Sequence, residues 1–390
     1  MDINLTCTGL ISAQSDVQYG KVVSKNEKEV KKPRESNIEL LRIVAMLAIV
    51  AHHYVVNSGL LDLVHKTPGL SLNSVFLLLL GPFGNTATNC FILIMGYFMC
   101  MSKMTLKKFL KLFLEIEFYK IVINLIFLFS AYRTYSYKGL FASLTPFYGI
   151  GKGFVPSILP FFLFIPFLNS LIHAMDKKMH LRLVALCLFL FTFLPSFIFY
   201  PIFITADVNF GDLGWFSTVY LLAAYMRIYP EEWFGKKNIW LAYAVISIVL
   251  AFASVIVMSY VAKCFEVKSA WYAYYFVAGP NKILAVTTSV CVFMLFKNMK
   301  PFYNKYINTI AASVFGVLLI HANGPTMRRW LWKDTLNNTG YYNADFHILL
   351  LHAICSVIAI YIICTLLDML RIKFIEKPFF RWYDRRVAGN

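Results

Sequence analysis

Between Ile38 and Val56 the chain reads IELLRIVAMLAIVAHHYVV, a stretch that is apolar apart from Glu39, Arg42 and two histidines near its end. At about 1.5 Å of rise per residue, a helix of this length crosses the hydrocarbon core of a bilayer. A charged group and a titratable ring are costly inside hydrocarbon, and such residues mark functional sites. The stretch therefore predicts a membrane span that carries part of a functional site.

The spacing of Arg42 and His53 sets their side chains on one face of this helix. At about 100° per residue, eleven steps make three full turns plus about 20°, which stacks the two side chains about 16 Å apart along the axis. His52 points about 80° away from that line. The spacing therefore singles out His53.

The composition of the chain predicts its broad class. Hydrophobic residues make up 59% of the 390 residues and 15% are charged, whereas soluble domains carry about 25% charged residues. Mean hydropathy is +0.63. We expect an all-α, polytopic integral membrane protein with about ten transmembrane helices. The spans are predicted near residues 38–57, 85–101, 106–130, 155–173, 181–199, 213–229, 238–260, 279–297, 308–323 and 346–369. A further apolar piece, Val75–Leu80, is too short to cross, and we expect it to be re-entrant or interfacial.

The distribution of polar and basic residues predicts where the membrane domain begins and which of its sides faces the cytoplasm. Residues 1–33 are polar, lack the apolar core of a secretory signal and are expected to form a disordered cytoplasmic tail. Residues 34–390 are expected to form one ten-span membrane domain, since no soluble insertion or repeat interrupts them. With this start in the cytoplasm, the inner loops hold most of the 37 lysines and arginines. The positive-inside rule then places both termini in the cytoplasm.

Several classes of function are disfavoured by the sequence. The formal net charge of +17 is spread over short loops, so membrane topology and anionic lipid explain it better than a nucleic-acid partner. The chain has no GxxxxGK[ST] loop, no HExxH motif and no GxSxG elbow. Its eight cysteines include no CxxC pair, which argues against a disulfide framework, and no metal is expected.

Four segments of the chain resemble the membrane-bound acyltransferase family 3. The first is Lys32–Met46, KPRESNIELLRIVAM, leading to His52–Tyr54, in which an arginine is followed by ten residues and then a histidine, the hallmark of that family. The second is Asn89–Phe98, NCFILIMGYF, which is similar to the family's FFxxSGY segment. The third and fourth are Ser313–His321, SVFGVLLIH, and Ile375–Pro378, IEKP. The resemblance covers the chain from about residue 34 to its end.

This resemblance implies transfer of an acyl group, usually acetyl from cytoplasmic acetyl-CoA, to a hydroxyl of a cell-surface or lipid-linked glycan. Acetyl-CoA would then be the acyl-donor substrate, and succinyl in place of acetyl stays open. The expected partners are acyl-CoA, the glycan acceptor and the lipid bilayer. The resemblance also implies location in the plasma membrane of a bacterium, the inner membrane.

In such a reaction we expect His53 to act as general base on the acceptor hydroxyl, because an imidazole of near-neutral pKa suits that proton transfer. A covalent acyl-imidazole is the variant mechanism. The plainer alternative is a buried histidine whose hydrogen bonds a neighbouring helix satisfies. Arg42, near the cytoplasmic end, is expected to bind the donor and to be held by Glu39 as an i,i+3 pair. Its alternative is a snorkelling charge that only sets topology.

Further donor contacts are predicted from Arg34, Lys108 and Lys111, although basic residues of inner loops need no other role. Two positions depart from the family pattern. Met95 stands where the family usually has serine, and Lys108 and Lys111 stand where an RxxR pair is common. Lysine cannot clamp a phosphate bidentately as arginine does.

Three supporting residues complete the predicted site. Glu117 could orient a base or neutralise Lys120. His321 could hydrogen-bond a sugar or simply end a helix. Glu376 resembles a family position, and its alternative is an ion pair with a lysine beside it in the sequence.

Alternatives from other classes remain open at this stage. A secondary transporter or a flippase of lipid-linked sugars also has many spans, but it should show broken helices in corresponding halves, and no such symmetry is visible. A glycan polymerase usually carries a long acceptor-side loop. The aromatic run Trp271–Phe276 could stack on sugar rings, although an interfacial belt is the preferred interpretation.

Overall fold

The computed structural model describes most of the chain after residue 34. The described residues are 35–130, 153–197, 211–387, Tyr132, Gly139, Phe141, Leu144 and Thr145. Throughout these residues the regular structure is helical and contains no strand, which confirms the predicted all-α class. The predicted tail, residues 1–33, and Arg34 lie outside the described residues.

The helices follow one another through short connections. In chain order they are α2 (Ser36–Val56), α3 (Leu60–Lys66), α4 (Leu72–Leu80), α5 (Gly84–Met99), α6 (Leu106–Phe129), α8 (Phe154–Ala174), α9 (Lys177–Leu188), η1 (Phe189–Phe193), α10 (Leu194–Phe197), α11 (Gly211–Ile228), η2 (Glu232–Gly235), α12 (Lys237–Cys264), η3 (Ala270–Tyr274), α13 (Ile283–Lys297), α14 (Lys305–Ala311), α15 (Val314–His321), α16 (Pro325–Arg329), η4 (Trp330–Thr335), η5 (Asn338–Tyr341), α17 (Phe346–Arg371), η6 (Ile372–Glu376) and α18 (Lys377–Val387).

Six helices in the described part are long and apolar enough to cross a membrane, and a bent pair raises this to seven. The protein is therefore a multi-pass membrane protein. The predicted count of ten spans is not confirmed, because α6, α11 and α13 do not pass the same test of length and composition. Helix α13 has only 15 residues, and α6 carries lysines and glutamates along its length.

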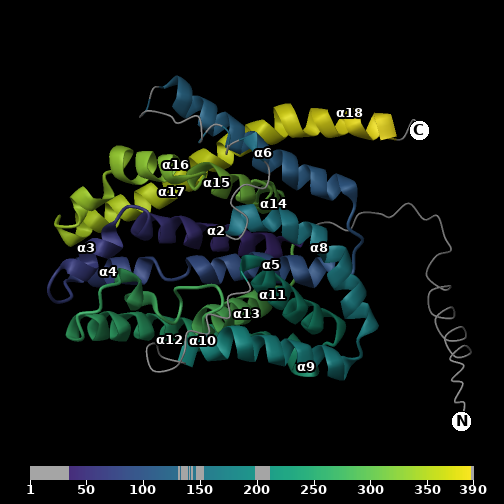
Figure 1. Ribbon diagram of the computed structural model, residues 1–390, viewed down its shortest axis with the longest axis horizontal. Coiled ribbons are helices and arrows are strands. Elements are labelled where there is room, and N and C mark those ends of the chain that lie inside the picture. Colours follow the sequence, from purple (N-terminus) through teal and green to yellow (C-terminus); the bar gives the residue numbers. More distant parts are fainter. Residues whose placement is uncertain are drawn as a thin grey trace, which may run out of the picture. The chain divides into compact units, whose positions relative to one another are not determined.

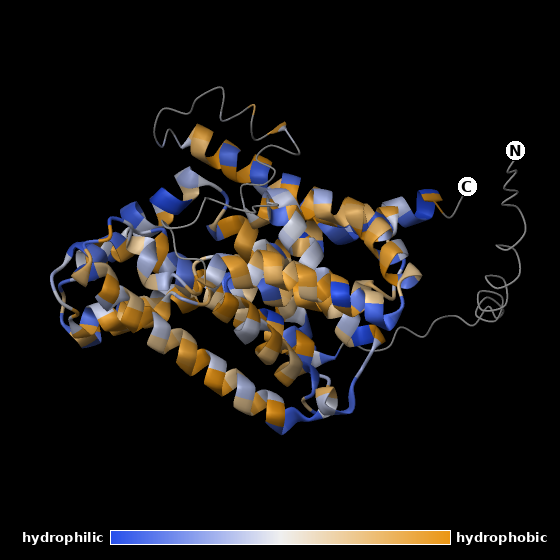
Figure 2. Cartoon of the chain, turned by 60° about the horizontal axis from the view of Figure 1, so that its bottom comes forward, coloured by the Kyte–Doolittle hydropathy of each residue, from blue (hydrophilic) through white to orange (hydrophobic). Residues whose placement is uncertain are grey.

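The outer surfaces of α12 and α17 are apolar. Leu250 of α12 is 52% exposed and Leu351 of α17 is 64% exposed. Figure 2 shows the same pattern more broadly, with hydrophobic colour along the helix bodies and hydrophilic colour chiefly at loops and helix ends. Large contiguous apolar surface is unfavourable in water, so these faces contact lipid.

Helix α4 corrects the expectation for the apolar piece Val75–Leu80. It is not a separate re-entrant segment, because α4 and α5 together form one membrane-crossing rod, Leu72–Met99. The turn at Gly81 and Pro82 does not end the rod, since helical hydrogen bonding resumes where the Ala87 amide donates to the Phe83 carbonyl (2.9 Å).

Helix α2 lies in the middle of the bundle, with α5 and α17 on either side of it (Figure 1). It also packs against α13, α14 and α15. Polar side chains fix its first turn: Asn37 Nδ2 donates to the Phe296 carbonyl (2.9 Å), and Ser36 Oγ donates to Asn308 Oδ1 (2.8 Å). The helix that carries Arg42 and His53 is therefore enclosed by protein rather than by lipid.

The predicted span near 308–323 corresponds to the rod Lys305–His321, which is the first half of a bent pair. The rod Lys305–His321 ends at His321, and the following rod, Pro325–Tyr341, is turned by 90°. Gly324 is extended between them, and proline follows it at the first helical position, where a missing amide hydrogen costs nothing. The segment near 324–345, which the sequence places outside the membrane, thus folds back as α16, η4 and η5, and the side chain of its Trp332 is fully buried.

Candidate active site

His53 and His321 are in direct contact. His53 Nδ1 lies 2.9 Å from His321 Nε2, and His321 Nδ1 lies 2.6 Å from the Val317 carbonyl oxygen. His321 is fully buried, whereas His53 is half-buried. The plainer alternative for His53 is that a neighbouring helix satisfies its hydrogen bonds. His321 does so at Nδ1, whereas Nε2 of His53 has no hydrogen-bond partner among the described residues.

The contacts of His321 determine the tautomers of both rings. A carbonyl oxygen only accepts, so His321 must carry its proton on Nδ1 and, when neutral, must accept at Nε2. His53 must then donate from Nδ1, which leaves the lone pair of a neutral His53 on Nε2. The pair therefore presents one basic nitrogen, held in a fixed direction by a chain of two hydrogen bonds.

The break after α15 brings His321 to this position. Because the rod ends at His321 and the chain turns away by 90°, the imidazole stands at a helix end next to α2 instead of inside a continuous helix. The ring of buried Trp332 lies edge-on to His321, at 6.3 Å between centroids. Arg328 of α16 is close enough to act electrostatically on His53 and His321.

His52 points to a different set of neighbours, as the helical spacing predicts. Its Nδ1 donates to the Gly81 carbonyl (2.5 Å), and a Cβ on Gly84 would collide with its ring. Trp271 of η3 lies 6.1 Å from His52 between ring centroids and is 44% exposed. Trp271 of the aromatic run therefore contacts His52 and is not only part of a surface belt.

Arg42 makes the i,i+3 contact that the sequence predicts. Its Nη1 lies 3.5 Å from Glu39 Oε2, and the Glu39 carboxylate is almost buried. Both residues lie in unbroken α2, so the helix itself separates Arg42 from His53 by the predicted three turns. Donor binding by Arg42 stays a prediction.

The two lysines predicted to bind the donor already have partners. Lys108 Nζ donates to the Lys103 carbonyl (2.8 Å), and Lys111 Nζ lies 2.7 Å from Glu376 Oε1. Glu376 thus pairs across helices, and not with a lysine beside it in the sequence.

The other predicted carboxylate, Glu117, lies 3.1 Å from Lys120 Nζ, and Lys120 also donates to the Thr145 carbonyl (2.7 Å). This contact agrees with the interpretation in which Glu117 neutralises Lys120. Neither residue contacts His53 in the part of the chain that the structure describes.

Arg371 is the centre of a buried ionic network that sequence reasoning missed. Its guanidinium lies 2.7 Å from Asp368, 3.0 Å from Glu115 and 3.0 Å from Glu376. Tyr119 OH donates to the same Asp368 oxygen (2.8 Å), and the Tyr119 ring lies under the guanidinium. The signal was present, because Asp368 and Arg371 are opposite charges three residues apart in an apolar run.

This network lies against α15, the helix that carries His321. A Cβ on Gly316 would collide with the Asp368 carboxylate, so glycine is what allows the carboxylate to approach. Gly316 precedes His321 by about 7.5 Å of helix. The network therefore fixes the helix that positions the histidine pair.

Comparison with known proteins gives one match. A family model described as an acyltransferase domain matches residues 35–369, which include α2 and the His53–His321 pair. No curated protein and no solved structure matches.

Proposed function

Because this chain belongs to the acyltransferase family whose model matches residues 35–369, we propose that it transfers an acyl group from acyl-CoA to a hydroxyl of a sugar. The family membership confirms the resemblance to this family, and the matched residues include the second and third of the four segments and most of the first, whereas Ile375–Pro378 lies beyond them. Acetyl-CoA as the donor and a cell-surface or lipid-linked glycan as the acceptor are the specific form of the proposal. The observation that supports the chemistry best is the hydrogen-bond chain from Val317 through His321 to His53.

In this proposal His53 is the general base. Its Nε2 takes the proton of the acceptor hydroxyl while that oxygen attacks the thioester carbonyl carbon. The C–S bond then breaks, and the leaving thiolate takes the proton from the imidazolium. His321 keeps accepting the Nδ1–H bond throughout, which stabilises the positive charge that His53 carries between the two steps.

The variant mechanism uses the same lone pair as a nucleophile. Nε2 would attack the thioester, release coenzyme A as the thiolate and hold the acyl group until the sugar hydroxyl displaces it. Rapid unfolding, at neutral pH, of enzyme incubated with labelled donor alone separates the two, because label on His53 appears only in the covalent route and an acyl-imidazole would be hydrolysed in acid.

The donor is proposed to approach the Arg42 end of α2. Arg42 would contact a phosphate of the nucleotide, with Glu39 holding the guanidinium in place. Phosphate contacts by Arg34, Lys108 and Lys111 stay predictions from the sequence, and Lys111 would have to exchange Glu376 for phosphate.

The acceptor is proposed to approach beside Trp271. A half-exposed indole beside His52, the sequence neighbour of His53, offers a flat apolar face on which a sugar ring can stack. Arg328 supplies a positive charge close to His53, where negative charge develops on the thioester oxygen during attack.

The experiment is a transfer assay on membranes that contain the protein, with acetyl-CoA radiolabelled in the acetyl group. We expect label in surface or lipid-linked glycan, and a loss of at least about 100-fold in the His53→Ala variant. His347→Ala is the matched control, since His347 is exposed in α17, and it should transfer at the normal rate. Unchanged transfer by His53→Ala would overturn the assigned role of this residue. Incorporation from labelled succinyl-CoA alone would change the acyl group and leave the site assignment intact.

A further inference from the structure

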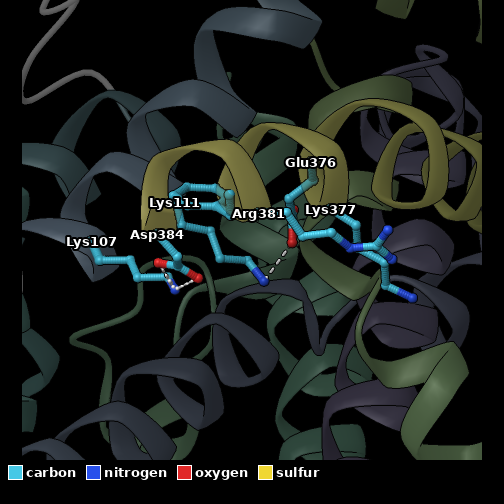
Figure 3. Close-up of a pocket in the computed structure, with 7 residues that line it drawn as sticks. Lys107, Lys111, Glu376, Lys377, Arg381 and Asp384 are labelled. Atoms are coloured by element: carbon cyan, nitrogen blue, oxygen red, sulfur yellow. Dashed lines mark hydrogen bonds and ion pairs between the residues drawn. The ribbon is translucent and has the colours of Figure 1, made fainter. Parts of the chain in front are cut away.

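A cleft lies between the first turns of α6 and helix α18, away from the histidine pair (Figure 3). Its volume is about 260 Å³. The residues that line it are Lys107, Lys111, Glu376, Lys377, Phe380, Arg381 and Asp384. Four cations and two carboxylates therefore face one space, which leaves it positively charged.

Two of the four cations are already paired with carboxylates. Lys107 Nζ donates to both carboxylate oxygens of Asp384 (2.6 and 2.7 Å), and Lys111 pairs with Glu376. These pairs join α6 to the end of the chain and appear as dashed lines in Figure 3.

Lys377 and Arg381 are the other two, and neither has an ion-pair or hydrogen-bond partner among the described residues. They are four residues apart in α18, so they project from the same face of the helix, as the sticks in Figure 3 show. Both side chains are exposed. The cleft thus offers two free cations beside two neutralised ones.

The cleft lies at the depth where lipid headgroups are expected. Helix α17 has 26 residues and so covers about 39 Å, more than the hydrocarbon thickness of about 30 Å. The chain continues as helix through η6 into α18, so α18 begins beyond the hydrocarbon.

Helix α18 has the composition of an interfacial helix. Its sequence is KPFFRWYDRRV, in which aromatic and basic residues alternate. Trp382 is 55% exposed, and Leu106 at the start of α6 is 65% exposed. Exposed aromatic and apolar side chains beside free cations are typical of surfaces that bind both the tail and the headgroup of an anionic lipid.

We propose that this cleft binds the phosphate of an anionic phospholipid, with Lys377 and Arg381 as its ligands and with the lipid tails against the apolar side chains of α6 and α18. The phosphates of coenzyme A share the headgroup's chemistry. Coenzyme A has no long lipid tails to cover exposed Trp382 and Leu106 on the helices that flank the cleft, which is why the lipid is the favoured source. In this assignment Lys111, which the sequence predicts as a donor contact, stays paired with Glu376.

The test measures lipid binding to the full-length protein in detergent by native mass spectrometry. Phosphatidylglycerol is titrated against phosphatidylcholine of the same acyl chains. We expect the wild type to prefer phosphatidylglycerol, and the double variant Lys377→Gln, Arg381→Gln to bind it about tenfold more weakly or worse. Lys236→Gln, Lys237→Gln is the matched control, because these exposed neighbouring lysines also lie at the start of a membrane helix.

Three results would overturn the proposal. Equal retention of phosphatidylglycerol by the wild type and by the Lys377/Arg381 variant would remove these residues from the site. Equal binding of both lipids by the wild type would remove the requirement for negative charge. Displacement of phosphatidylglycerol by coenzyme A but not by its 3′-dephospho form would assign the cleft to the donor instead. None of these readouts depends on acyl transfer, so failure here leaves the proposed function standing.

Discussion

At the scale of single residues, the Val317 carbonyl determines which nitrogen of His53 carries the proton, although it does not contact His53. That oxygen requires a proton on His321 Nδ1, and the requirement passes through His321 to His53, whose lone pair is left on Nε2. The sequence alone predicts Arg42 and His53 as a pair, because both lie on one helix with countable geometry. It cannot predict the contact with His321, since 268 residues separate the two rings and helical periodicity carries no information over that distance.

The first prediction concerns His321. Replacing it with alanine removes the acceptor for the Nδ1–H of His53, so the ring is free to rotate and to change tautomer. We expect kcat to fall by about 10²- to 10⁴-fold while KM for acetyl-CoA stays within about twofold. Steady-state kinetics with purified protein in detergent checks this. A rise in KM with kcat unchanged would instead indicate that His321 contacts substrate.

The second prediction concerns Trp271. Removing the indole in Trp271→Ala should raise KM for the glycan about fivefold to tenfold and leave KM for the donor unchanged, since stacking contributes about 1 kcal/mol. Trp271→Phe should restore most of the loss. Trp233→Ala is the control, because Trp233 is equally exposed (44%) and lies in η2. A parallel rise in both KM values would contradict the assignment of Trp271 to the acceptor.

At the scale of secondary structure, the arrangement depends on where helices break and on what holds the broken ends. The rod Lys305–His321 is too short and too interrupted to fix His321 by itself, and α17 supports it through the contact of Asp368 with Gly316. The sequence predicts both helices, and its span near 308–323 corresponds to the rod Lys305–His321, but it does not predict the 90° turn that follows. Gly324 and Pro325 mark the break in retrospect, whereas no local pattern reveals that Trp332, beyond the turn, becomes fully buried.

The third prediction concerns the ionic network of Arg371. In Arg371→Ala the buried carboxylates of Glu115 and Asp368 lose their counter-charge, and we expect a loss of about 3–5 kcal/mol in unfolding free energy. Lys373→Ala, an exposed neighbour, should change stability by less than about 0.5 kcal/mol. Equilibrium unfolding in mixed detergent micelles measures both. A loss below about 1 kcal/mol for Arg371→Ala would show that water or lipid compensates the carboxylates.

At the scale of the whole molecule, composition predicts the all-α membrane class correctly, because lipid contact demands apolar surface along entire helices. It predicts the number of crossings less well. A helix can turn its charged residues toward other helices, as α6 does with Glu115 and Glu117, and it can be short, as α13 is, so hydropathy no longer identifies every crossing helix. Both termini in the cytoplasm stay a prediction from the distribution of basic residues.

The fourth prediction tests that orientation. Cys264 is exposed at the end of α12 and is expected outside the cell, whereas a cysteine at position 386 is expected inside. A membrane-impermeant maleimide should label Cys264 in intact cells, with the signal lost in Cys264→Ser. In the Cys264→Ser background, Arg386→Cys should be labelled only after permeabilisation. Labelling of Arg386→Cys in intact cells would contradict the predicted topology and place this end of the chain outside the cell.

The brevity of α13 has a consequence for the membrane itself. Fifteen helical residues cover about 22 Å, less than the hydrocarbon thickness of about 30 Å. The preceding segment fills part of the difference by turning inward, where Tyr274 is buried and the Ala278 carbonyl accepts from Asn85. If a helix this short crosses the bilayer, either the hydrocarbon beside it thins or neighbouring protein fills the difference. Under the proposed function, the acyl group would then have a shorter apolar distance to cover between the side from which the donor enters and the side that holds the acceptor.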